Sequence, residues 1–116
     1  MDLGLKGRVA IVAAASTGLG RAAATELSKE GAKVAICART VATLERTADD
    51  IRKETGGEVL AKALDVRNEE EVGHFVSDVE AHFGKIDICV TNSGGPPSKL
   101  FADTRTEEWR SAVDLL

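Results

Sequence analysis

The chain has 116 residues, 43% of them hydrophobic and 29% charged, and its eleven glycines and two prolines are typical of a single soluble α/β domain. Its formal net charge is −4, and Lys and Arg are scattered among Asp and Glu, which argues against nucleic acid as a partner. No apolar run approaches the roughly 20 residues of a membrane span, and the N-terminus lacks the pattern of a signal peptide, so we expect a cytoplasmic protein.

The first half of the chain predicts two strand-helix units. Residues 8–14 form an apolar run without alternation, which is typical of a strand buried on both faces of a parallel sheet. Residues 18–30 carry a helical stripe of apolar positions, and Gly31 stands where a C-terminal cap belongs. The same pattern predicts a strand at 33–38 and a helix at 41–55.

A third unit follows. Residues 59–64 are predicted as a strand, and Asn68 is predicted to cap a helix that ends near Phe83, before Gly84. Glu71 stands three residues after Asn68, the spacing of a capping box.

The last part of the chain predicts a fourth strand at 86–91 and a loop at 92–103 that is dense in turn residues. Either Thr104 or Thr106 is expected to cap a final helix. Trp109 lies on an apolar face of this helix, which we expect to need a partner.

Strands that alternate with helices predict an α/β fold, a doubly wound parallel sheet covered by helices on both faces. The expected strand order is 3-2-1-4, and ligands bind such sheets in a crevice at the carboxyl ends of the strands, between the first and the fourth. Cys37 and Cys89 would then be separated by the first strand, about 10 Å apart, which is too far for a disulfide. We expect both to act as small hydrophobic residues.

The turn after the first strand has the features of a phosphate-binding loop. It directs the free N–H groups and the positive dipole end of the next helix toward the crevice. Gly18 would let phosphates approach the backbone, and Gly20 would let the helix pack close to the strand. The expected contacts in this turn are Ala14, Ser16, Thr17, Gly18, Leu19 and Gly20. The alternative is an ordinary connection that happens to use glycine.

Three further strand ends lead to the same crevice. Arg39 lies 19 residues after Gly20, where an acidic residue would hold the ribose 2′-hydroxyl of NAD; a guanidinium there can instead bind a 2′-phosphate, with Thr40 as an added donor. The alternative is a solvated arginine. Asp65, followed by Val66, could accept a hydrogen bond from an adenine amino group, or it could simply begin a turn.

The end of the fourth strand brings small polar groups to the other wall of the crevice. Asn92, Ser93 and Gly94 are expected to contact a ribose or the nicotinamide side of a cofactor. His74 and His82 lie eight residues apart without a second-ligand spacing, so we interpret them as solvated residues and expect no metal site.

Together these motifs resemble the short-chain dehydrogenase/reductase family, whose fold is of the Rossmann type. The resemblance runs along essentially the whole chain, and the matching positions are Gly18, Gly20, Arg39, Asp65, Asn92 and Gly94. It implies NADP, or less readily NAD, as the cofactor. Alanines at 13 and 14 replace the family's Thr and first Gly, and Thr91 and Ser93 replace an Asn and an Ala. The 3-oxoacyl-carrier-protein reductase-like branch shows similar departures.

The resemblance also implies what this chain lacks. The family interconverts carbonyls and alcohols by hydride transfer, with a catalytic Ser and a Tyr-x-x-x-Lys pair in a later part of the fold. This chain contains no Tyr, and Leu116 occupies the position of the family's catalytic Asn. We therefore expect a half-domain that ends before the fifth strand, has no catalytic residues, and self-associates through the exposed fourth strand and last helix.

Three hypotheses remain open from the sequence. The favoured one is the cofactor-binding segment of an NADP-dependent oxidoreductase, in which a small carbonyl or alcohol substrate is bound only when the missing half is supplied. The second is a non-catalytic nucleotide-binding or assembly module. The third is a decayed or incomplete gene product without activity.

Overall fold

The structure, a computed structural model, describes residues 1–95 and 97–116. Its centre is a parallel sheet in the order β3-β2-β1-β4, as predicted. The strands are β1 (Val9–Ala13), β2 (Lys33–Ala38), β3 (Val59–Ala63) and β4 (Ile88–Val90). The helices are α1 (Gly18–Lys29), α2 (Val41–Thr55), α3 (Glu69–Phe83) and α4 (Thr106–Leu115). No helix in the described ranges is both long and apolar enough to cross a membrane.

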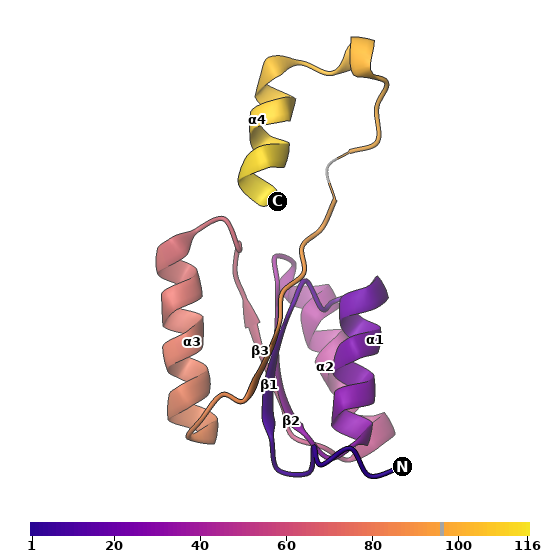
Figure 1. The fold of residues 1–116 in the computed structure, drawn as a ribbon, viewed down its shortest axis with the longest axis vertical. Coiled ribbons are helices and arrows are strands. Elements are labelled where there is room, and N and C mark those ends of the chain that lie inside the picture. The colour runs from indigo at the N-terminus through magenta and orange to yellow at the C-terminus, as the bar shows by residue number, and fades with distance from the viewer. Residues whose placement is uncertain (96) are drawn as a thin grey trace.

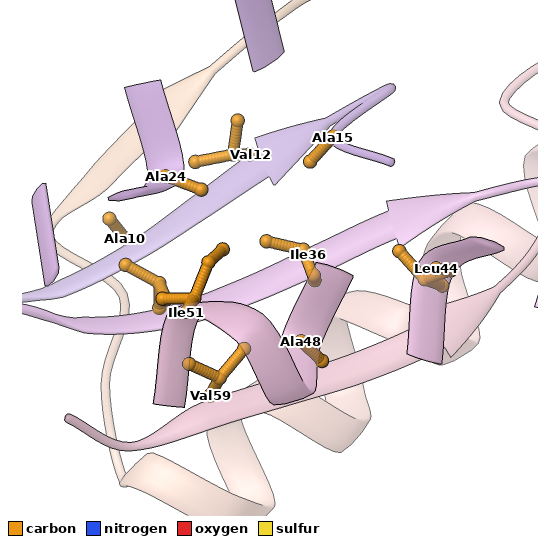
Figure 2. Close-up of a cluster of buried hydrophobic side chains, with 10 residues drawn as sticks. Ala10, Val12, Ala15, Ala24, Ile36, Leu44, Ala48, Ile51 and Val59 are labelled. Atoms are coloured by element: carbon orange, nitrogen blue, oxygen red, sulfur yellow. The ribbon is translucent and has the colours of Figure 1, made fainter. Parts of the chain in front are cut away.

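Helices cover both faces of the sheet. Helices α1 and α2 lie on one face and α3 on the other, whereas α4 lies beyond the carboxyl ends of the strands (Figure 1). Figure 2 shows the larger core, where Val12 and Ile36 from the sheet meet Leu44 and Ile51 from α2. These four side chains are at most 1% exposed because α2 packs its apolar stripe against this face of the sheet.

The opposite face forms a second core against α3. Ile11 and Cys37 pack there with Phe75 and Val79 of the helix. Cys37 lies on β2 and Cys89 on β4, so β1 separates them, and both thiols are free. The predicted separation of the two cysteines is therefore confirmed.

The ends of α2 and α3 follow the predicted signals with one exception. Gly56 and Gly84 end α2 and α3 in the left-handed conformation, and the Asn68 side chain accepts a hydrogen bond from the Glu71 N–H. The second hydrogen bond of the predicted capping box, from the Asn68 N–H to the Glu71 side chain, does not form, so this part of the prediction is wrong. The Glu71 carboxylate accepts from the N–H of Asp65 instead, because the Asn68 N–H is already bonded to the Asp65 carbonyl.

The last part of the chain departs more from expectation. The paired part of β4 is shorter than residues 86–91, and the expected loop at 92–103 includes residue 96, which lies outside the described residues, and a short 3-10 helix at Phe101–Asp103. Neither Thr104 nor Thr106 caps α4, so that prediction is wrong. The Thr104 hydroxyl donates to the Leu100 carbonyl, and Arg105 takes the N-cap position with its N–H bonded to the Glu108 carboxylate.

Candidate functional site

The carboxyl ends of the strands surround a cavity of about 380 Å³. Of the predicted contacts, those that line it are Ala14, Ser16, Thr17, Leu19, Arg39, Thr40, Asp65, Val66, Asn92, Ser93 and Gly94. The two glycines of the turn, Gly18 and Gly20, do not line it. Residues from four separate strand ends are thus brought together, which is the placement that the doubly wound topology predicts.

The turn after β1 is tight although its first glycine position holds an alanine. Ala14 has a φ of 50°, the left-handed region, which an L-residue adopts only at a cost of about 1–2 kcal/mol. Gly18 has a φ of 61°. A Cβ on Gly20 would lie 2.3 Å from the Ala14 carbonyl oxygen, so only glycine allows α1 to approach the strand this closely.

The N-terminus of α1 keeps its backbone donors available. Thr17 is the N-cap residue, and its side chain makes no capping hydrogen bond, whereas the N-terminus of α3 is capped by Asn68. The first N–H groups of a helix have no partner within the helix and carry its positive dipole end. Because Thr17 and Leu19 line the cavity, this end of α1 faces a space that an anion can occupy.

A side chain of α2 holds the turn from behind. Thr47 is 1% exposed, and its hydroxyl donates to the Ser16 carbonyl over 2.6 Å. Arg21 of α1 donates to Thr47 and, over 3.1 Å, to Asp50. Sequence patterns missed these residues, because their role depends on how α1 and α2 pack together.

Arg39 and Thr40 are exposed at the end of β2, on the margin of the cavity. None of the ion pairs described among residues 1–95 and 97–116 involves Arg39. Its guanidinium is therefore available to a bound anion.

Asp65 is held by a neighbour that the sequence patterns did not single out. The Arg67 guanidinium donates to both carboxylate oxygens, with its Nη2 2.8 Å from Oδ2, and the Arg67 N–H donates to Oδ1. These hydrogen bonds lower the pKa of Asp65 to about 2, with the charge of Arg39 as a smaller cause. Asp65 is thus an anion at neutral pH and a poor proton donor.

The remaining wall of the cavity lies after β4. The Asn92 Nδ2 is 3.5 Å from the Ala14 carbonyl oxygen, a long hydrogen bond that links this segment to the turn after β1. Ala38, Leu64 and Leu115 also line the cavity and were not predicted. The first two directly precede predicted residues and could have been inferred, whereas Leu115 could not, because its place depends on the path of the chain after β4.

A second hollow, of about 450 Å³, lies on the α3 side of the sheet. Its lining is largely apolar, with Phe75 and Val76 of α3 opposite Val90 and Leu116. It shares Leu64, Val66, Asn92, Ser93 and Leu115 with the first cavity.

The chemistry available in the first cavity is that of binding. Arg39 and Asp65 are its titratable side chains, beside hydroxyls and backbone N–H groups. No group of three or more metal-ligating side chains lies in the described part of the chain. The arrangement can bind a ligand with separate phosphate groups, one at the N-terminus of α1 and one at Arg39.

Comparison with known proteins agrees with this geometry. The sequence model of the family described as short chain dehydrogenase matches residues 8–115. The chain is 36% identical to 11-beta-hydroxysteroid dehydrogenase-like 2 of Arabidopsis thaliana over 110 residues, covering 94% of this chain and 36% of that protein. It is 34% identical to dehydrogenase/reductase SDR family member 11 of Gallus gallus, covering 94% of this chain and 43% of that protein.

Two solved structures are similar throughout. L-sorbose reductase from Gluconobacter frateurii, complexed with NADPH and L-sorbose, matches with a TM-score of 0.91 at 35% identity. The match covers 100% of this chain and 44% of the reductase chain. An alcohol dehydrogenase from Thermococcus sibiricus, complexed with 5-hydroxy-NADP, matches with a TM-score of 0.85 at 34% identity. This match covers 93% of this chain and 46% of the dehydrogenase chain. The chain therefore spans less than half the length of these relatives.

Proposed function

This chain belongs to the short-chain dehydrogenase family, and we propose that its cavity binds NADP(H) as the cofactor-binding portion of an NADP-dependent oxidoreductase. The N-terminus of α1 would hold the pyrophosphate, Arg39 and Thr40 the 2′-phosphate, and Asp65 with Val66 the adenine. Asn92, Ser93 and Gly94 would contact the nicotinamide-side ribose. When bound, such a cofactor supplies hydride chemistry; the residues of this chain bind and orient it.

One observation carries the choice of NADP over NAD. Arg39 lies at the end of β2, where it is exposed and forms no ion pair among the described residues. An acidic side chain at this position would favour NAD, because it would repel a 2′-phosphate. A guanidinium binds phosphate with two parallel hydrogen bonds. The NADPH complex of L-sorbose reductase supports the same cofactor class.

We further propose that the chain alone binds the cofactor without transferring hydride. Its sequence contains no Tyr, and the titratable groups that line the cavity are a guanidinium and a carboxylate whose pKa is about 2. Neither is suited to exchange a proton with a carbonyl or alcohol near neutral pH. A small carbonyl or alcohol substrate would need residues from outside these 116.

The test is calorimetric titration of the purified chain with NADPH and with NADH. We expect saturable binding that favours NADPH, and we expect Arg39→Asp to weaken NADPH binding by about 10- to 100-fold, because it removes charge-assisted hydrogen bonds. Arg46→Asp makes the same charge change at an exposed position of α2 outside the cavity lining and should have little effect. Equal loss in both variants, or no binding of either nucleotide, would contradict the proposal.

A second candidate, an assembly module, is favoured by the exposed apolar residues of the last segment. Phe101, Trp109 and Val113 are 82%, 49% and 73% exposed, and β4 has one paired neighbour among the described residues. Sedimentation at increasing protein concentration tests this role. A monomer at every concentration would exclude self-assembly.

A further inference from the structure

A buried hydroxyl behind the turn after β1 connects the cavity to α2. Thr47 donates its hydroxyl hydrogen bond to the Ser16 carbonyl over 2.6 Å and is 1% exposed. The Arg21 Nη1 lies 3.5 Å from the same hydroxyl oxygen, and its Nη2 is 3.1 Å from Asp50. One side chain of α2 thus fixes a backbone group of the turn, and one side chain of α1 braces it.

This contact determines how the next peptide group points. In a planar trans peptide the C=O of one residue and the N–H of the following residue point in opposite directions. With the Ser16 carbonyl bonded to Thr47, the Thr17 N–H is directed away from α2. Ser16 and Thr17 both line the cavity, so the orientation of this one peptide group affects the donors that meet a bound anion.

We propose that Thr47 is a positioning residue for the pyrophosphate-binding turn, which it holds in a binding-ready conformation without touching the ligand. The inference rests on the proposed binding of NADP(H). Thr47 is absent from the lining of the cavity, so its effect acts through Ser16. Loss of the hydroxyl should weaken binding of the pyrophosphate group and spare the adenosine end, which Arg39 and Asp65 serve.

Two ligands that differ in the pyrophosphate separate these effects. The first is 2′-phospho-ADP-ribose, and the second is adenosine 2′-monophosphate, which lacks the 5′-pyrophosphate. In NMR titrations of the full chain we expect Thr47→Val, which keeps the shape and removes the hydroxyl, to weaken binding of the first about tenfold. Binding of the second should change by less than about twofold. Thr47→Ser, which restores the hydroxyl, should bind both nearly as the unchanged chain does.

The chain offers a matched control at the C-terminal end of α2. The Thr55 and Ser28 hydroxyls lie 2.7 Å apart and form a second link between α1 and α2, far along both helices from the turn. Thr55→Val therefore removes a comparable hydroxyl contact and should leave the affinity for both ligands unchanged. If Thr47→Val does not fold, Arg21→Met serves instead, because Arg21 is half-exposed and its loss removes the brace on Thr47. It should show the same selective loss at about threefold.

The outcomes are distinct. Selective loss for 2′-phospho-ADP-ribose, rescued by Thr47→Ser, supports the positioning role. Equal weakening of both ligands, an equal effect of Thr55→Val, or no effect of any variant would overturn the role while leaving cofactor binding intact. Failure of the unchanged chain to bind either ligand would overturn the proposed function and the positioning role with it.

Discussion

The early and the late part of the chain differ in how well apolar sequence is packed. In the early part β1, β2 and β3 lie against α1 and α2, and Val12, Val34 and Ile36 are completely buried. In the late part β4 is only partly buried, and no residue of α4 is buried. We call the first part the packed half (residues 9–63) and the second the open half (residues 88–95 and 97–116).

The difference shows that apolar composition does not by itself produce burial. In the part of the chain that the structure describes, β3 and β4 are both edge strands, but Val59 of β3 is buried in the core with residues of α2, whereas β4 is only partly buried. The α1 N-terminus and Arg39 belong to the packed half, and Asn92 to Gly94 follow the strand of the open half. We therefore expect the part of the cavity beside α1 and Arg39 to be more rigid than the wall formed by residues 92–94.

The largest expected effect comes from emptying the packed half. Ile36→Ala removes a fully buried side chain between the sheet and α2 and should lower the free energy of unfolding by about 2–5 kcal/mol, measured by urea denaturation. Val113→Ala, at an exposed position of α4, is the control and should change it by less than about 0.5 kcal/mol. Similar losses at the two sites would show that the open half is packed in solution.

A second pair of variants tests the close contact between the turn and α1. Gly20→Ala places a Cβ 2.3 Å from the Ala14 carbonyl oxygen, a backbone atom that cannot move aside cheaply, and should destabilise the chain by about 1–3 kcal/mol. Gly73→Ala in α3 meets no atom within 4 Å and should stabilise it by about 0.5–1 kcal/mol through helix propensity. Thermal unfolding should give shifts of opposite sign, and shifts of the same sign would contradict the close approach.

Sequence patterns predict most of the packed half and less of the open half. The helix expected at 41–55 was confirmed at both ends, because its apolar stripe and the following Gly56 are local signals. The cavity residues followed from the strand ends in the same way. The Arg67 bonds to Asp65, the Thr47 bond to Ser16 and the Arg105 cap could not be predicted, because each depends on side chains that meet only after folding.

A smaller effect is expected at Ala14, where the turn is strained. Its left-handed conformation costs an L-residue about 1–2 kcal/mol, and glycine removes that cost but adds about 0.4–1 kcal/mol of entropy in the unfolded chain. Ala14→Gly should therefore stabilise the chain by about 0.5 kcal/mol in urea denaturation. Ala15→Gly, at a buried neighbour whose φ is not positive, should destabilise it. A loss of stability in Ala14→Gly would show that Ala14 is not strained.

The smallest effect on stability concerns Asp65 and Arg67, which follow the packed half in the chain and, through Arg67, contact α4 of the open half. Hydrogen bonds from Arg67 lower the pKa of Asp65 to about 2, and the Arg67 Nη1 also lies 3.5 Å from the Ser111 hydroxyl of α4. A carboxyl whose pKa is lowered by folding contributes stability above its unfolded pKa and loses it as the pH falls through the folded value. Here that window runs from about pH 4 down to about pH 2.

NMR titration of the Asp65 carboxyl separates the two contacts of Arg67. Arg67→Met should raise the pKa of Asp65 part of the way toward the ordinary value near 3.9, because it removes the guanidinium donors, whereas the backbone N–H of residue 67 still donates to the carboxylate. Ser111→Ala should leave that pKa low, because the four hydrogen bonds between Arg67 and Asp65 do not involve α4. If Ser111→Ala instead raised the pKa, α4 would be holding Arg67 in place, and the open half would take part in shaping the cavity beside Asp65.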